Sequence, residues 1–195
     1  MLFRSVVNNG PLLTLTSTTT QPLCNGGTDG SASVAAAGGT APYAYTWDNA
    51  TSGNSIINVA AGTYVVTVTD QVGCTGTASV TINQPSPISV TFVVTPTTCH
   101  GGSDGSAIAT ASGGTGPYTY RWACGINVPN LTGRPAGTYT LVVTDAHGCT
   151  GTFSTQITEP APITLTVNKI NVSCNGGSNG AINISTRSEE HTSEL

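Results

Sequence analysis

Charged side chains are scarce in this sequence, and their scarcity excludes several classes of protein. Only 7% of the residues are charged, and Lys169 is the single lysine. Disordered chains stay expanded through high net charge and low hydrophobicity, and this chain has too little charge for that. Its formal net charge of −4 also provides no basic surface for nucleic acid.

Long helices and membrane spans are not expected either. Helix formers such as Leu, Glu, Lys and Arg are sparse, and no apolar run approaches the roughly 20 residues that cross a bilayer. Residues 1–10 contain no apolar segment adequate for a complete signal peptide. We interpret the chain as a piece of a longer secreted protein. Short β-branched runs separated by glycines predict many brief strands and turns.

The sequence repeats itself with one fixed offset. Cys24, Cys99 and Cys174 are 75 residues apart (99 − 24 and 174 − 99), and Cys74 and Cys149 have the same spacing (149 − 74). Residues 24–85 align with residues 99–160 without a gap at 30 identical positions of 62. A tandem array of small domains is therefore expected.

The repeat predicts the domain boundaries. We assign residues 1–9 to an upstream fragment, 10–84 to a first copy, 85–159 to a second copy, and 160–186 to the first strands of a truncated third copy. Residues 187–195 change composition abruptly and resemble a translated sequencing adapter, so we interpret them as a non-native tail. Proline pairs at 84–87 and 159–162 are typical of short, stiff linkers.

Alternating apolar residues and turn residues predict six or seven short strands in each copy. In the first two copies the expected strands lie near residues 30–37, 43–47, 56–59, 62–70, 74–82 and 88–95. This pattern predicts an all-β fold of tandem immunoglobulin-like Greek-key β-sandwich domains, each of about 75 residues.

The cysteines carry the strongest chemical signal. Cys24 with Cys74, and Cys99 with Cys149, have identical spacing in the two complete copies, which predicts one disulfide within each copy. Such a bond would contribute about 4 kcal/mol in the chain-entropy model and requires an oxidising compartment. Cys124 is an additional thiol without a counterpart in the first copy.

A zinc site is the alternative for the second copy. His100 adjoins Cys99, and His147 lies two residues before Cys149, so four metal-type ligands would converge if these cysteines met. The first copy keeps both cysteines without the histidines. We therefore favour disulfides.

Aromatic side chains alternate along one expected strand in each copy and share one face. They are either a platform for sugar rings or part of the core, and we favour the core. The residues are Tyr43, Tyr45, Trp47, Tyr118, Tyr120 and Trp122.

Aspartates lie near both cysteine positions, where carboxylates from one end of a domain could hold calcium. Asp before Gly is also a common turn signal, so the pattern leaves both interpretations open. The residues are Asp29, Asp70, Asp104 and Asp145. Neither these carboxylates nor any serine, histidine or glycine motif forms a recognisable catalytic set, so we expect no enzyme and no obligatory cofactor.

Several blocks occur in the same order in both complete copies. They are Cys-(Asn/His)-Gly-Gly-(Thr/Ser)-Asp-Gly-Ser-Ala, Gly-Gly-Thr-x-Pro-Tyr-x-Tyr-x-Trp, Ala-Gly-Thr-Tyr and Val-Thr-Asp-x-x-Gly-Cys-Thr, followed by a Pro-x-Pro-Ile boundary. Residues 24–162 thereby resemble the SprB repeat of very long Bacteroidetes surface proteins, among them a gliding-motility adhesin. The resemblance implies type IX secretion, display at the cell surface, and adhesion or gliding.

Two functions follow from these observations. The copies are structural spacers that contact neighbouring repeats and form a semi-rigid rod, or they are binding modules for surface polysaccharide or calcium, similar to the PKD-like sandwich. Burial of Tyr43, Tyr45 and Trp47 would favour the spacer.

Overall fold

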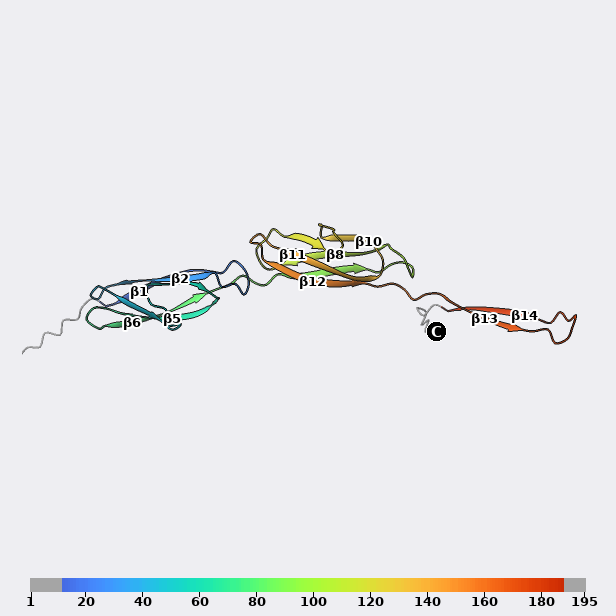
Figure 1. Ribbon diagram of the computed structural model, residues 1–195, viewed down its shortest axis with the longest axis horizontal. Coiled ribbons are helices and arrows are strands. Elements are labelled where there is room, and N and C mark those ends of the chain that lie inside the picture. The colour runs from blue at the N-terminus through green and yellow to red at the C-terminus, as the bar shows by residue number, and fades with distance from the viewer. Residues whose placement is uncertain (1–11, 188–195) are drawn as a thin grey trace, which may run out of the picture. The chain divides into compact units, whose positions relative to one another are not determined.

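The computed structural model describes residues 12–187, and every regular element in this range is a β-strand (Figure 1). Within these residues we find no helix with the length and apolar character needed to cross a membrane. Residues 1–9 of the expected upstream fragment and residues 188–195 of the expected tail lie outside the described range. Arg187, which we had assigned to that tail, is the last residue of a strand.

The first copy is built from two three-stranded antiparallel sheets. One sheet has the order β1 (Thr14–Thr20), β2 (Gly30–Ala37) and β4 (Ser55–Val59). The other has the order β3 (Ala44–Trp47), β5 (Gly62–Thr69) and β6 (Thr75–Ile82). The chain therefore changes sheet on each side of β3 and again after β4.

The second copy repeats this arrangement with all its strands. One sheet contains β7 (Ser89–Thr95), β8 (Gly105–Ser112) and β10 (Asn130–Arg134). The other contains β9 (Thr119–Trp122), β11 (Gly137–Thr144) and β12 (Thr150–Ile157). The prediction of tandem all-β, immunoglobulin-like sandwiches is confirmed.

One apolar layer lies between the two sheets of the first copy. Every second residue of β2 and β5 points into it, as the alternation predicts, and the Trp47 side chain is 1% exposed. The buried cluster draws on both sheets, which is what makes the copy a sandwich. Its members are Ala32, Val34, Trp47, Ile56, Val66, Val68, Val80 and Ile82.

The second copy fills the same layer with different volumes. Ala109 and Thr155 occupy the positions of Val34 and Val80, which removes apolar volume. Phe92, at the position of Ser17, restores it, because its ring centroid lies 6.0 Å from that of Trp122. The second copy thus fills the same layer with a partly different set of side chains.

The third segment is a hairpin of β13 (Thr164–Ile170) and β14 (Ala181–Arg187). Ile182 and Ile184 correspond to the buried Ala107 and Ala109 of the second copy, yet both are exposed. Among the described residues no second sheet covers this hairpin. Its sequence aligns with the first two strands of a complete copy.

The described residues fall into two compact units. The first comprises the chain up to Ser89 together with residues 112–118 and 144–150, and the second comprises residues 90–111, 119–143 and the described chain from Gly151 onward. Two turns of the second copy therefore belong to the same compact unit as the whole of the first copy. The second of these turns carries Cys149.

Neighbouring valines of β5 test whether the apolar layer determines stability. Val66 is fully buried opposite Trp47, whereas Val65 is 40% exposed on the other face. We expect Val66→Ala to lower the free energy of unfolding of the first copy by about 2 kcal/mol, from lost burial plus a cavity, and Val65→Ala by about 0.5 kcal/mol or less. Urea unfolding followed by tryptophan fluorescence measures both. Equal losses in the two variants would contradict the observed assignment of the strand faces.

Candidate functional site

The first part of the site is the loop between β1 and β2, which carries Cys24. The Gly27 N–H donates to the Cys24 carbonyl oxygen at 3.0 Å, and the Asp29 carboxylate accepts the Leu23 N–H at 3.1 and 3.3 Å. The linker is bonded to the same loop, because the Gly26 N–H donates to Gln84 Oε1 at 2.8 Å. The Asn25 side-chain amide also donates to the Pro85 carbonyl oxygen at 2.9 Å. Loop and linker thus form one hydrogen-bonded structure.

The second part of the site is the β11–β12 turn, which carries Cys149. One carboxylate organises this turn: Asp145 accepts the backbone N–H groups of Thr115, His147 and Cys149 at 3.0, 2.9 and 2.9 Å. The Asp145 N–H in turn donates to the Cys149 carbonyl oxygen at 2.9 Å. The Cys149 side chain is therefore presented from a closed turn.

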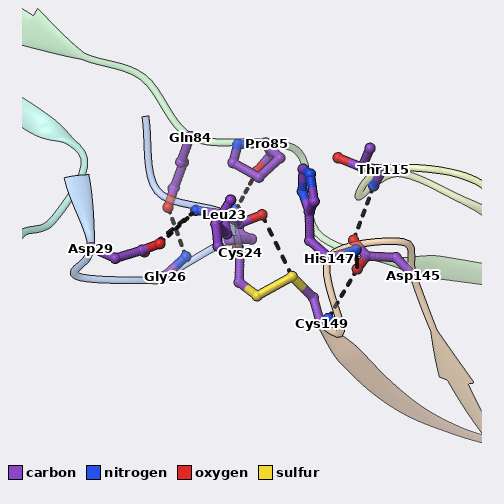
Figure 2. Close-up of a disulfide and its surroundings, with 11 residues drawn as sticks. Leu23, Cys24, Gly26, Asp29, Gln84, Pro85, Thr115, Asp145, His147 and Cys149 are labelled. Carbon is purple, nitrogen blue, oxygen red and sulfur yellow. Dashed lines mark hydrogen bonds between the residues drawn. A yellow bond between two sulfur atoms is a disulfide. The ribbon is translucent and has the colours of Figure 1, made fainter. Parts of the chain in front are cut away.

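A disulfide joins these two parts, as Figure 2 shows. Cys24 and Cys149 are bonded with a Cα–Cα distance of 5.6 Å across 125 residues of sequence. Cys149 Sγ also contacts the Leu23 carbonyl oxygen at 3.5 Å. Both cysteines are half-buried and lie in the first compact unit. The bond therefore connects the first copy to a turn of the second copy.

This pairing corrects the one predicted within each copy. Cys74 and Cys99 are free, exposed thiols, and Cys124 and Cys174 are free as well. Cys24 precedes the start of β2, whereas the Cys74 turn lies beside Thr40, just after the end of β2. Eight residues of strand separate these ends by roughly 26 Å, far more than a disulfide spans. Cys99 and Cys149 are separated in the same way by β8.

The turn aspartates are held in their ionised form. Asp70 and Asp145 are 5% exposed, and burial alone would raise the pKa of each carboxyl. The backbone N–H groups that each carboxylate accepts outweigh this effect and lower both pKa values below 3.8. The pKa of Asp104 is also lowered, chiefly because the Thr98 hydroxyl donates to it at 2.6 Å.

These contacts separate the carboxylates that we had considered as calcium ligands. Asp29 and Asp70 occupy opposite ends of β2, and each closes its own turn; Asp104 and Asp145 are arranged in the same way about β8. The zinc alternative is not assembled either, because Cys149 is in the disulfide and His100 lies 3.5 Å from Glu159. Within residues 12–187 no three His, Cys, Asp or Glu side chains are grouped as metal ligands.

The aromatic stripe belongs to the core. The indoles of Trp47 and Trp122 are buried and donate to the carbonyl oxygens of Gly53 and Val128 at 2.9 and 3.0 Å. Tyr43 and Tyr45 are half-buried against the same apolar cluster, and Tyr118 and Tyr120 are half-buried in the second copy. Buried indoles offer no face to a sugar ring, so interpreting these tryptophans as a ligand platform is not supported.

Sequence reasoning missed the linker side chain that closes the cysteine loop. Gln84 bonds to Gly26, and its counterpart Glu159 accepts the Gly101 N–H at 2.7 Å in the second copy. The sequence contains a signal for this role, because both residues directly precede the first linker proline. Their side chains differ only in that one ends in an amide and the other in a carboxylate. Equivalent side chains thus close equivalent loops.

Comparison with known proteins identifies the repeated unit. The family model described as SprB repeat matches residues 16–52 and 91–125, which are equivalent segments of the two complete copies. No curated protein matches this sequence.

Solved structures with similar chains consist of immunoglobulin domains. The N-terminal eight Ig domains of Down Syndrome cell adhesion molecule isoform 1.30.30 align with 78% of this chain and 25% of that chain, at 15% identity and a TM-score of 0.37. The amphioxus IgVJ-C2 molecule aligns with 73% of this chain and 96% of its own, at 17% identity and a TM-score of 0.31. This chain spans about a quarter of the first structure.

The disulfide can be mapped by mass spectrometry of the unreduced chain. We expect one cross-linked peptide pair, containing Cys24 and Cys149, and free thiols at the other four cysteines. Cys149→Ser should abolish the cross-link, whereas Cys74→Ser should leave it unchanged. A cross-link between Cys24 and Cys74 would contradict the structure.

The lowered aspartate pKa values predict acid sensitivity. A carboxyl with a folded pKa below its unfolded value contributes stability that is complete above the unfolded pKa, near 3.9, and is lost as pH falls through the folded pKa. We therefore expect the Tm to fall below about pH 4. The Asp70→Asn/Asp145→Asn variant should have a lower Tm at neutral pH and a flatter profile between about pH 5 and about pH 2. An unchanged acid slope in this variant would refute the assignment.

Proposed function

Because this chain is a tandem SprB-repeat protein, we propose that it is a structural segment of a large secreted bacterial surface protein. Its copies act as a stalk that extends or positions an adhesive region in surface attachment or gliding. In this proposal the parent protein belongs to the Bacteroidetes and is exported by type IX secretion. The partners of each copy are the neighbouring repeats of the same chain.

The disulfide is the observation that carries the proposal. It connects residues 125 positions apart, so most of both complete copies lies between its two ends. A pulling force applied to the two ends of the chain passes through this bond instead of through the enclosed strands. A covalent bypass of every strand of the two copies except β1 and β12 is a property that a stalk under tension needs. It also fits the oxidising conditions outside the cytoplasm.

The use of the aromatic and acidic side chains supports the same function. The tryptophans fill the core, and the tyrosine hydroxyls close turns: Tyr64 and Tyr139 donate to the carbonyl oxygens of Ala60 and Pro135 at 3.0 and 2.9 Å. The aspartates cap backbone turns. The side chains that a sugar- or calcium-binding module would present are therefore employed in holding each copy together, and we favour the stalk over that alternative.

Force spectroscopy on the chain, tethered at its two ends, tests the stalk. With the disulfide intact, the segment between Cys24 and Cys149, whose sequence separation is 125, should remain inaccessible to extension. Reduction should release it, adding about 400 Å of contour length at roughly 3.4 Å per residue. This gain in contour length is much larger than the extension released when a single hydrogen-bonded strand pair ruptures.

Two serine variants provide the matched controls. Cys149→Ser should show the long extension without reductant, and Cys74→Ser should behave as the unmodified chain does. If the oxidised chain released the full length at the same force as the reduced chain, the disulfide would carry no load and the proposal would fail.

A further inference from the structure

The loop that carries Cys99 has the same structure as the loop that carries Cys24. The Gly102 N–H donates to the Cys99 carbonyl oxygen at 3.0 Å, and Asp104 accepts the Thr98 N–H, as Asp29 accepts that of Leu23. Glu159 bonds to the loop as Gln84 does in the first copy. Cys99 is nevertheless an exposed thiol, whereas Cys24 is in a disulfide.

The turn that carries Cys74 is likewise the counterpart of the Cys149 turn. The Cys74 N–H donates to Asp70 Oδ1 at 2.8 Å, and the Asp70 N–H donates to the Cys74 carbonyl oxygen at 2.9 Å. Thr40 completes this turn as Thr115 completes the other. Cys74 is exposed and free. The Cys99 loop and the Cys74 turn therefore repeat the two halves of the Cys24–Cys149 joint with equivalent hydrogen bonds. These two segments are not bonded to each other.

We infer that the cysteines of this array pair from copy to copy, the first cysteine of each copy with the second cysteine of the copy that follows. Cys24–Cys149 is one such bond. Cys99 then bonds to the second cysteine of a complete following copy, and Cys74 bonds to the first cysteine of a preceding copy. This inference does not depend on the mechanical function proposed above, since a binding array would be joined in the same way.

Distance explains why neither free thiol is paired within its own copy. Cys99 precedes the start of β8, and Cys149 lies near Thr115, beyond the end of that strand. Cys24 and Cys74 are similarly separated by β2. Cys124 is not part of this system, because the first copy has Asn49 at its position. It serves as an internal reference for an exposed thiol outside the joint.

Formation of each bond is an oxidation. The Cys99 thiol and the thiol of the following copy lose two protons and two electrons as the S–S bond forms. The acceptor is a disulfide compound, such as oxidised glutathione or a protein thiol oxidase with a disulfide centre, which is reduced to two thiols. The reaction proceeds by thiolate attack through a mixed disulfide, so the exposure of Cys99 is a requirement for it.

Tandem duplication of residues 85–159 within the full chain tests the inference. The inserted copy places its second cysteine 125 residues after Cys99, the separation of the existing pair. Exposed marker substitutions in that copy, Ser103→Thr and Thr152→Ser, distinguish its two cysteine peptides by mass. After oxidation with oxidised glutathione, peptide mapping should find two cross-links: Cys24 with Cys149, and Cys99 with the marked second cysteine.

Two variants serve as controls. Cys99→Ser should leave the marked cysteine open to alkylation, and Cys174→Ser should leave both cross-links in place. The Cys24–Cys149 cross-link in the same sample reports that the chain has folded. A marked cysteine that remains free beside an intact Cys24–Cys149 bond, or that pairs with the first cysteine of its own copy, would overturn the inference.

A second duplication keeps the test decisive if the first one does not fold. When marked residues 10–84 are inserted after Gln84, copy-to-copy pairing requires Cys24 to change partner. It should bond to the second cysteine of the inserted copy, while Cys149 bonds to the inserted first cysteine. Retention of a direct Cys24–Cys149 bond across the inserted copy would show that the pairing is specific to those two residues, and would overturn the inference.

Discussion

A single apolar layer between two three-stranded sheets is the constraint on which the rest of each copy depends. Copies of about 75 residues bury little apolar surface, so a few side chains around Trp47 or Trp122 must supply most of the favourable free energy. The strand ends lie beyond most of this layer. They are closed by side chains that bond to backbone groups, such as Asp70 at one end and Asp29 and Gln84 at the other.

The two complete copies differ at several core positions but share the motifs of their cysteine loops and turns. Phe92, Ala109 and Thr155 replace Ser17, Val34 and Val80, and the layer still closes. By contrast, the Asp-x-x-Gly-Cys turn and the Cys-x-Gly-Gly loop keep both their residues and their hydrogen bonds. A core tolerates exchange at constant volume. A joint that must hold two sulfur atoms at bonding distance, as Cys24 and Cys149 are held, tolerates much less.

Strand positions and the aromatic core could be predicted from the sequence because alternation reports directly which face of a strand is buried. The cysteine pairing could not, since a repeat spacing is compatible with bonds inside a copy and with bonds between copies. Strand length held the missing information. The residues from Gly30 to Ala37 form one uninterrupted strand, and such a strand places Cys24 and the Cys74 turn at opposite ends of the domain. Strand length excludes the pairing that we predicted only once the structure places the Cys74 turn beside Thr40.

The position of the disulfide relative to the linker has a further mechanical consequence. The chain passes from the first copy to the second through Pro85 and Pro87, and the Cys24–Cys149 bond provides a second covalent connection. Two copies joined only by a linker can rotate about it, whereas a second bond removes part of that freedom. Asn25 and Gly26 bond to Pro85 and Gln84, so the linker is also hydrogen-bonded to the cysteine loop. The boundary is therefore constrained by the cross-link as well as by the prolines, and the cross-link depends on the redox state of the surroundings.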